Sequence, residues 1–202
     1  MASVNTSPSR GKPKGDKRDR TRAALLDAAR ALIREKGYER TTLEEVASRA
    51  GMTTGAIYGN FKNRDELFIA LAEAYWAPIA PDVKPGASFA DTMRAIARAT
   101  IAAIPARQLA AGGRLTGMAY TLTHDEMRAR VADVTAKDYA AGAAWLRAVV
   151  DERELPMPPE RLVRVLHALI EGLTFQRLLT PELFPDEVFF AAFDALVPRA
   201  AP

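Results

Sequence analysis

The spacing of apolar residues along the chain predicts a protein built only of helices. From Lys17 onward, apolar side chains recur at three- and four-residue intervals, as in Leu25 and Ala28, which is the period of an amphipathic helix. Gly37 and Gly51 are placed to end the first two helical stretches, because glycine adopts the left-handed conformation that stops a helix. No stretch shows the alternation that is typical of a half-buried strand. The expected fold class is therefore all-α.

Cap residues locate the helices that follow the first one. Thr42 with Glu45, and Asn63 with Glu66, have the spacing of a capping box, in which two side chains satisfy backbone amides reciprocally. We expect short helices over 42–51 and 53–60, and a fourth helix after residue 63.

A cluster of prolines and a glycine, Pro78, Pro81, Pro85 and Gly86, breaks this pattern and predicts a boundary between two modules. Five more helices are expected beyond it, with Pro105 separating the first two and a Thr123–Glu126 capping box starting the third. They cover 88–104, 107–122, 125–152, 159–179 and 186–197. The expected domains are 1–16, a disordered basic arm, then 17–76 and 77–202.

Composition excludes several kinds of chemistry. The 202 residues include no cysteine and only two histidines, which excludes thiolate metal sites, disulfides and histidine-rich metal centres. We find no Ser–His–Asp constellation and no glycine-rich phosphate loop, so we expect neither an enzyme nor a cofactor. No apolar run approaches the roughly 18 residues of a membrane span, and the N-terminus has no signal-peptide core. We expect a cytoplasmic protein with no membrane partner.

Positive charge is concentrated near the N-terminus, although the whole chain carries a net charge of only +3. Residues 10–22 hold seven cations against Asp16 and Asp19, which leaves a small excess of anions in the rest of the chain. A basic arm ahead of a folded module favours an anionic partner such as nucleic acid. The alternative is a solvated leader that aids solubility, and charge alone does not separate the two.

The segment from Thr42 to Arg64, TLEEVASRAGMTTGAIYGNFKNR, has the layout of a helix-turn-helix. Two short helices flank a turn centred on Gly51, and the small Ala47 lets the helices cross closely. The second helix of such a unit enters the major groove and presents its first turns to base edges. The segment therefore predicts binding to double-stranded DNA.

This region, from about Arg18 to Tyr75, resembles the TetR family of transcriptional regulators. The resemblance rests on GYERTTLEEVASRAGMT and GAIYGNFKNRDELF, in which a Tyr-x-x-Phe-Lys run leads at once into a capped helix. It implies an N-terminal three-helix helix-turn-helix DNA-binding domain and a C-terminal helical ligand-binding and dimerisation domain, about nine helices in all. It also implies a sequence-specific regulator, a repressor that a small hydrophobic effector releases from a palindromic operator.

The resemblance further implies which residues meet DNA. Tyr58 and Lys62 match the family's backbone-contacting tyrosine and lysine, and Thr42 and Thr53 cap helices that abut the duplex. Asn60 is a candidate to pair with an adenine edge, because an amide matches its donor and acceptor. The alternatives are that Tyr58 packs between helices and that Lys62 is an ordinary surface lysine. The groove-facing positions are Thr54, Gly55, Ala56, Gly59 and Asn60.

By the same resemblance, the C-terminal module holds a homodimer interface and an effector cavity. Two apolar stripes would pack with their symmetry mates as a four-helix bundle, and an ordinary intramolecular core is the alternative. The candidate interface residues are Leu162, Leu166, Leu169, Leu173, Phe189 and Phe193. The candidate cavity residues, each of which has plain core packing as its alternative, are Met93, Ile96, Met118, Tyr120, Trp145, His167 and Phe175.

Two functions remain open at this point. The first is the DNA-binding repressor with a small hydrophobic effector. The second is a DNA-binding or scaffolding regulator with no small-molecule effector, controlled by a protein partner. Nothing in the sequence separates them.

Overall fold

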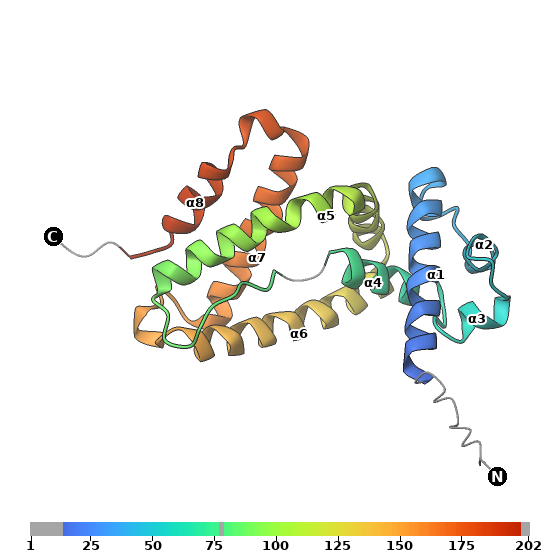
Figure 1. The fold of residues 1–202 in the computed structure, drawn as a ribbon, viewed down its shortest axis with the longest axis horizontal. Helices are drawn as coiled ribbons and strands as arrows, with labels where there is room; N and C mark the ends of the chain where they lie inside the picture. The colour runs from blue at the N-terminus through green and yellow to red at the C-terminus, as the bar shows by residue number, and fades with distance from the viewer. Residues whose placement is uncertain (1–13, 77–78, 199–202) are drawn as a thin grey trace, which may run out of the picture. The chain divides into compact units, whose positions relative to one another are not determined.

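The computed structural model describes residues 14–76 and 79–198, and all regular structure within them is helical (Figure 1). The expected all-α fold is thereby confirmed. The expected basic arm falls largely outside the described residues, and α1 begins at Lys14. No helix in these two ranges combines the length and the apolar character needed to cross a bilayer.

Eight α-helices and two short 3-10 helices follow one another along the described chain. The first four are α1 (Lys14–Lys36), α2 (Leu43–Arg49), α3 (Thr54–Tyr58) and α4 (Arg64–Tyr75). The others are α5 (Phe89–Thr123), α6 (Asp125–Val149), α7 (Pro159–Leu179) and α8 (Asp186–Asp194). The 3-10 helices are η1 (Glu152–Glu154), between α6 and α7, and η2 (Pro181–Leu183), between α7 and α8.

The chain divides into two compact units, and the division falls within α4, between Leu67 and Phe68. In the first unit, the apolar faces of the helices close on one another. Leu25 of α1, Val46 of α2 and Ile57 of α3 are all fully buried. These positions follow the helical spacing of apolar residues in the sequence, so the period that predicts the helices also supplies their core.

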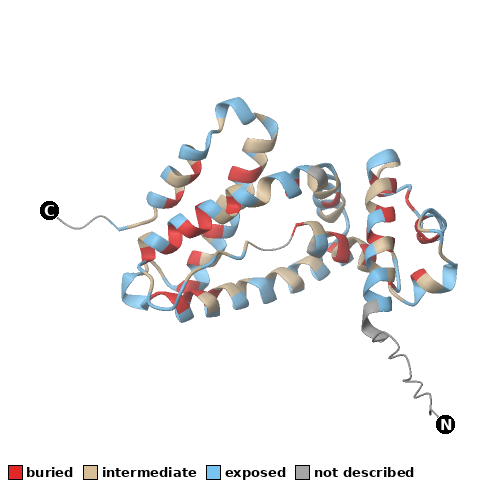
Figure 2. Cartoon of the chain, in the orientation of Figure 1, coloured by how far each residue is buried: buried red, intermediate tan, exposed pale blue. Residues whose placement is uncertain are grey.

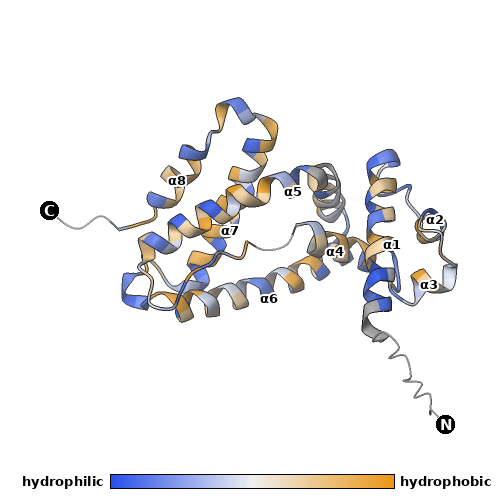
Figure 3. Ribbon diagram, in the orientation of Figure 1, coloured by the Kyte–Doolittle hydropathy of each residue, from blue (hydrophilic) through white to orange (hydrophobic). Residues whose placement is uncertain are grey.

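The second unit is built around α5, α7 and α8. Helix α8 packs along α5, and α7 packs against both α5 and α6. Figure 2 shows buried residues gathered on α5 and α7, whereas the middle of α6 is half-buried or exposed. Figure 3 shows hydrophobic residues along α5, α7 and α8. Residues of α6 line a cavity in this unit, which is described below.

Two expectations about the second unit are wrong. Pro105 does not separate two helices but lies inside the continuous α5, because its neighbours Ile104 and Ala106 lie in an alanine-rich stretch that favours helix. A proline inside a helix removes one hydrogen bond and more often bends the helix than ends it when packing holds both sides. The expected Thr123–Glu126 capping box does not form either, since the Thr123 hydroxyl donates back to the carbonyl of Tyr120 at 3.0 Å.

Candidate nucleic-acid interface and ligand cavity

The helix-turn-helix is built from two threonine caps and one glycine turn. The Thr42 hydroxyl accepts the N–H of Glu45 at 3.3 Å, and the Glu45 carboxylate accepts the N–H of Thr42 at 3.0 Å. Gly51 has a φ of 67°, which a glycine adopts without strain. The Thr53 hydroxyl then accepts the N–H of Ala56 at 3.3 Å and starts α3. The predicted capping box and turn are confirmed.

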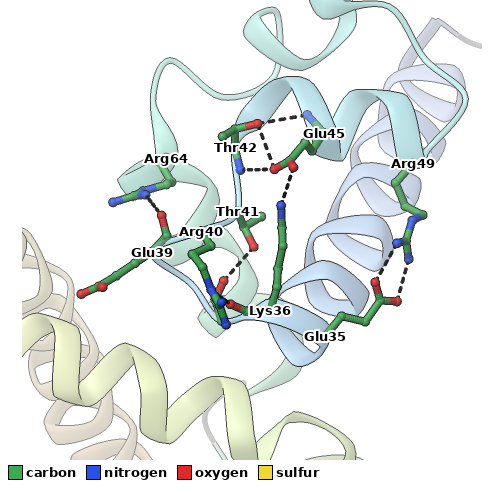
Figure 4. Close-up of polar contacts among 10 residues, drawn as sticks. Glu35, Lys36, Glu39, Arg40, Thr41, Thr42, Glu45, Arg49 and Arg64 are labelled. Carbon is green, nitrogen blue, oxygen red and sulfur yellow. Dashed lines mark hydrogen bonds and ion pairs between the residues drawn. The ribbon is translucent and has the colours of Figure 1, made fainter.

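Two ion pairs join α2 to α1 (Figure 4). Lys36 pairs with Glu45, and Arg49 binds both carboxylate oxygens of Glu35, at 2.8 and 2.7 Å. The Lys36 ammonium, together with the backbone N–H of Thr42, lowers the pKa of Glu45 to about 2. Exposed pairs contribute little stability each. Both pairs connect α2 to the C-terminal end of α1.

Helix α3 buries one side chain and presents most of the others. Ile57 is fully buried, whereas Tyr58 is 48% exposed. The helix is shorter than the predicted 53–60, since Gly59 forms its C-cap. Among the other residues predicted to meet DNA, Ala56 is half-buried and the exposed ones are Thr42, Thr53, Thr54, Gly55, Gly59 and Lys62.

Tyr58 holds its hydroxyl against α2. The hydroxyl donates to the carboxylate of Glu44 at 2.7 Å. This bond raises the pKa of Tyr58 and lowers the pKa of Glu44. The ring thus stands exposed beside the α2 N-terminus, with its hydroxyl hydrogen directed to a carboxylate oxygen. A phosphate oxygen is the same kind of acceptor.

Asn60 does not present its amide as predicted. Its Nδ2 donates to the carbonyl of Ala56 at 2.8 Å, and its Oδ1 is buried, with no hydrogen-bond partner among the described residues. Arg22 of α1 donates to the Asn60 carbonyl at 3.3 Å and stacks over the Phe61 ring, 4.5 Å from its centroid. The amide is therefore tied to its own helix rather than extended toward a base.

The second capping box differs from the predicted one in one of its two bonds. The N–H of Glu66 donates to Asn63 Oδ1 at 2.9 Å, as expected. The Glu66 carboxylate, however, accepts the N–H of Lys62 at 2.7 Å. This bond fixes the backbone of Lys62 two residues before α4, and the Lys62 side chain remains exposed.

The second unit holds a cavity of about 560 Å³ that is partly open to solvent. Its wall is mostly apolar and comes from the last part of α4, from α5, α6 and α7. Four of the predicted cavity residues line it, namely Ile96, Met118, Trp145 and His167. Desolvation by the surrounding protein is the main reason that the pKa of His167 is lowered.

Three predicted cavity residues lie elsewhere. Met93 is fully buried in the core of the second unit. Tyr120 stacks on His124, with ring centroids 3.6 Å apart. Phe175 stacks on Trp76 at 5.3 Å between centroids, and Trp76 itself lines the cavity.

Charged groups also lie together in the wall of this cavity, although the predicted cavity residues are nearly all apolar or aromatic. Arg107 and Arg114 of α5 and Glu171 of α7 all line it. Arg114 pairs with Glu171 at 3.2 Å, and the indole N–H of Trp76 donates to Glu171. Arg107 is 4% exposed and donates to the Thr174 hydroxyl at 3.3 Å.

Comparison with known proteins shows that the helix-turn-helix region matches a known family. The sequence profile described as bacterial regulatory proteins, tetR family, matches residues 25–71. The HTH-type transcriptional regulator TtgR of Pseudomonas putida is 44% identical over 54 residues, which are 27% of this chain and 26% of that protein. The chain thus aligns with about a quarter of the length of this curated relative.

Solved structures extend the likeness to the second unit. NalD, the secondary repressor of the MexAB-OprM multidrug efflux pump in Pseudomonas aeruginosa, is 25% identical with a TM-score of 0.59, over 91% of this chain and 98% of that one. SmeT, the repressor of the Stenotrophomonas maltophilia pump SmeDEF, is 26% identical with a TM-score of 0.56, over 88% and 90%. Residues 25–71 therefore match the TetR family, and the chain as a whole is similar to the repressors NalD and SmeT.

The apolar stripes predicted as a dimer interface face inward. Five of the six side chains are at most 6% exposed and belong to the core of the second unit, and Leu169 packs against that core. They are Leu162, Leu166, Leu173, Phe189 and Phe193. Exposed apolar side chains of the same region are Leu179 and Leu183.

The charged cavity residues are the functional candidates that the sequence analysis does not predict. Arg107 and Arg114 are seven residues apart, which places both on one face of a helix. Two arginines on one face of an alanine-rich helix are a pattern from which a charged site could be predicted. No sequence pattern points to Trp76 or Glu171, because they meet the arginines only through tertiary packing.

Proposed function

We propose that this chain is a transcriptional repressor that binds a palindromic DNA operator as a homodimer and is released by a small, largely apolar effector. The single observation that carries the proposal is the capped helix-turn-helix, with exposed Tyr58 and Lys62, inside the residues that match the family profile. The similarity to two efflux-pump repressors, NalD and SmeT, supports repression as the mode of regulation.

The geometry of α3 supports recognition through its first turns. The exposed Thr53, Thr54 and Gly55 form the N-terminal end of the helix, which is the end that enters the major groove in a helix-turn-helix. Phosphate contacts by Tyr58, Lys62 and the cap of Thr42 would set its position on the duplex. Because these contacts carry no base code, sequence recognition is assigned to the small residues of α3.

A dimer follows from the size of this surface. Five helical residues in α3 offer too few base contacts for useful specificity. A twofold dimer reads two half-sites roughly 34–36 Å apart, and so doubles the contacts. The operator is therefore expected to be a palindrome.

The cavity supports release by an effector rather than by a protein partner. A mostly apolar cavity of about 560 Å³ has the size of a typical small-molecule site. An effector that binds more tightly to the arrangement of the dimer that does not fit DNA lowers the affinity for the operator.

Selection of binding sites from a pool of random duplexes tests the proposal. The full chain should enrich a palindrome, and fluorescence anisotropy should show tighter binding to it than to a shuffled duplex of equal composition. A difference of about a thousandfold or more is expected for specific recognition. If no duplex is enriched even in dilute buffer, the chain is not a sequence-specific DNA-binding protein.

A further inference from the structure

Glu44 of α2 is a carboxylate with no cation beside it. The first turn of α2 holds two acidic residues, Glu44 and Glu45. Glu45 is paired with Lys36, whereas Glu44 forms no ion pair with any side chain that the structure describes. The hydrogen bond from the Tyr58 hydroxyl is the main cause that lowers the pKa of Glu44, and the neighbouring charge of Glu45 opposes this shift. Glu44 is therefore an uncompensated negative charge at neutral pH.

This carboxylate occupies the hydroxyl that the proposed function assigns to a DNA phosphate. The Tyr58 hydroxyl donates to Glu44 Oε1 at 2.7 Å, although the Tyr58 side chain is exposed. A tyrosine hydroxyl carries one hydrogen, so it cannot donate to Glu44 and to a phosphate at the same time. A phosphate oxygen must therefore displace the carboxylate before it can accept this hydrogen bond.

Repulsion between like charges adds to this competition. A phosphate oxygen bonded to the Tyr58 hydroxyl would lie within roughly 6 Å of the Glu44 oxygen that now accepts from it. This separation is shorter than the Debye length of about 8 Å at physiological ionic strength, so salt screens the repulsion only in part. Glu44 thus opposes the contact in two ways, by holding the hydrogen and by repelling the phosphate.

We propose that Glu44 is a built-in competitor of DNA phosphate for the Tyr58 hydroxyl and that it lowers the affinity of the chain for every duplex. This inference rests on the proposed function and names the residue that limits its affinity. Because a phosphate contact carries no base code, Glu44 weakens operator and other duplexes by the same factor and leaves the sequence preference unchanged. The weaker complex is easier to release, since an effector shifts binding only by its own differential affinity.

Removing the charge without changing the size of the side chain tests the inference. In anisotropy titrations of the full chain, Glu44→Gln should bind both the selected palindrome and its shuffled duplex about tenfold more tightly than the wild type. Glu39→Gln is the matched control, since Glu39 is an exposed carboxylate of the same unit that does not bond Tyr58, and its affinity should be nearly unchanged. Unchanged binding of Glu44→Gln would overturn the inference. Weaker binding would also overturn it, and would make Glu44 a residue that positions Tyr58 for DNA.

A double-mutant cycle separates competition for the hydrogen from repulsion alone. The Tyr58→Phe variant has no hydroxyl, so in that background Glu44→Gln can relieve only the repulsion. The gain in affinity from Glu44→Gln should therefore be smaller in the Tyr58→Phe variant than in the wild type. Equal gains in the two backgrounds would refute the competition. Circular dichroism confirms that each variant is folded.

A measurement without DNA separates this inference from the proposed function. The Glu44 carboxylate raises the pKa of Tyr58, so Glu44→Gln should lower that pKa toward its ordinary value in an NMR titration of the labelled tyrosine rings. A pKa that does not move would show that the contact is absent in solution, which refutes the inference and leaves the proposed function untouched. Wild-type binding with no gain in Glu44→Gln likewise refutes the inference alone. If neither protein binds any duplex, the proposed function and the inference fail together.

Discussion

The two units of this chain position their functional groups in different ways. In the first unit, the caps that shape the candidate DNA surface join residues that are close in sequence, such as Thr42 with Glu45 and Thr53 with Ala56. In the second unit, the charged side of the cavity joins Trp76 with Glu171, which are 95 residues apart. Local capping rules therefore describe the first surface, whereas only the packed fold creates the second.

This contrast is sharpest for the apolar stripes of α7 and α8. Phe189 is fully buried, with its ring edge-on to Phe184 at 6.2 Å between centroids. Phe189→Ala should lower the free energy of unfolding by about 3–5 kcal/mol, because it leaves a large cavity in the core. Urea denaturation measures this loss.

The control for this change is Leu183→Ala, since Leu183 is 76% exposed. It should leave the unfolding free energy of the chain nearly unchanged. If Phe189→Ala shifted only the monomer–dimer equilibrium in sedimentation, and left the folded chain as stable as before, Phe189 would belong to a dimer interface instead of the core.

A close contact within the second unit gives the next largest effect. A Cβ atom added at Gly117 of α5 would lie 1.6 Å from Cζ of Phe68, whereas one added at Gly113 would meet nothing within 4 Å. Gly117→Ala should therefore cost about 1–3 kcal/mol of stability through overpacking. Gly113→Ala, on the same helix, should add up to about 1 kcal/mol, because alanine favours helix. Equal unfolding curves for the two variants would show that Phe68 does not pack on Gly117.

In the first unit, the candidate DNA-binding surface can be tested by substitution. Changing Tyr58 to Phe together with Lys62 to Ala removes two candidate phosphate contacts while leaving the buried core untouched. Affinity for the selected duplex should fall by about 1–2 kcal/mol, and the slope of log affinity against log salt should flatten by about 0.9 for the lost lysine contact. Anisotropy titrations over a series of salt concentrations measure both quantities. Unchanged affinity and slope would remove Tyr58 and Lys62 from the interface.

The local structure of the first unit can be predicted from the sequence more fully than that of the second, for a physical reason. A cap such as Thr42 or a turn such as Gly51 is set by neighbours three or four residues away, so its geometry can be predicted. The amide of Asn60 bonds the carbonyl of Ala56 in its own helix, a contact that residue type does not predict. Pro105 was misplaced because packing and helix propensity carried α5 through a residue that usually ends helices.

The cavity and the apolar stripes show what sequence alone does not determine. A stripe of leucines on α7 is equally suited to a core or to a dimer interface, since both bury apolar area. Only the fold shows that Leu162 and Leu166 face inward. Likewise, the spacing of Arg107 and Arg114 places them on one face of a helix, but not opposite Trp76 and Glu171.

The smallest expected effect concerns the ion pair that joins α2 to α1. The pKa of Glu45 is about 2 in the folded chain, against an ordinary value of 4.5, because Lys36 and the Thr42 N–H favour its charged form. A lowered pKa means that the folded state binds the proton less tightly than the unfolded state. The stabilisation is therefore complete above about pH 4.5 and is lost as the pH falls toward about 2.

Glu45→Gln removes this titration, so the difference in melting temperature between the wild type and this variant should be largest above about pH 4.5 and should shrink toward about pH 2. High salt should reduce the difference at every pH, because the pair is exposed and its attraction is screened. Glu39→Gln is the control, since its carboxylate lies outside this ion pair. A difference for Glu45→Gln that did not change with pH would mean that the carboxylate acts only through the shape of the cap, and that the charge of Lys36 has no part in holding α2 on α1.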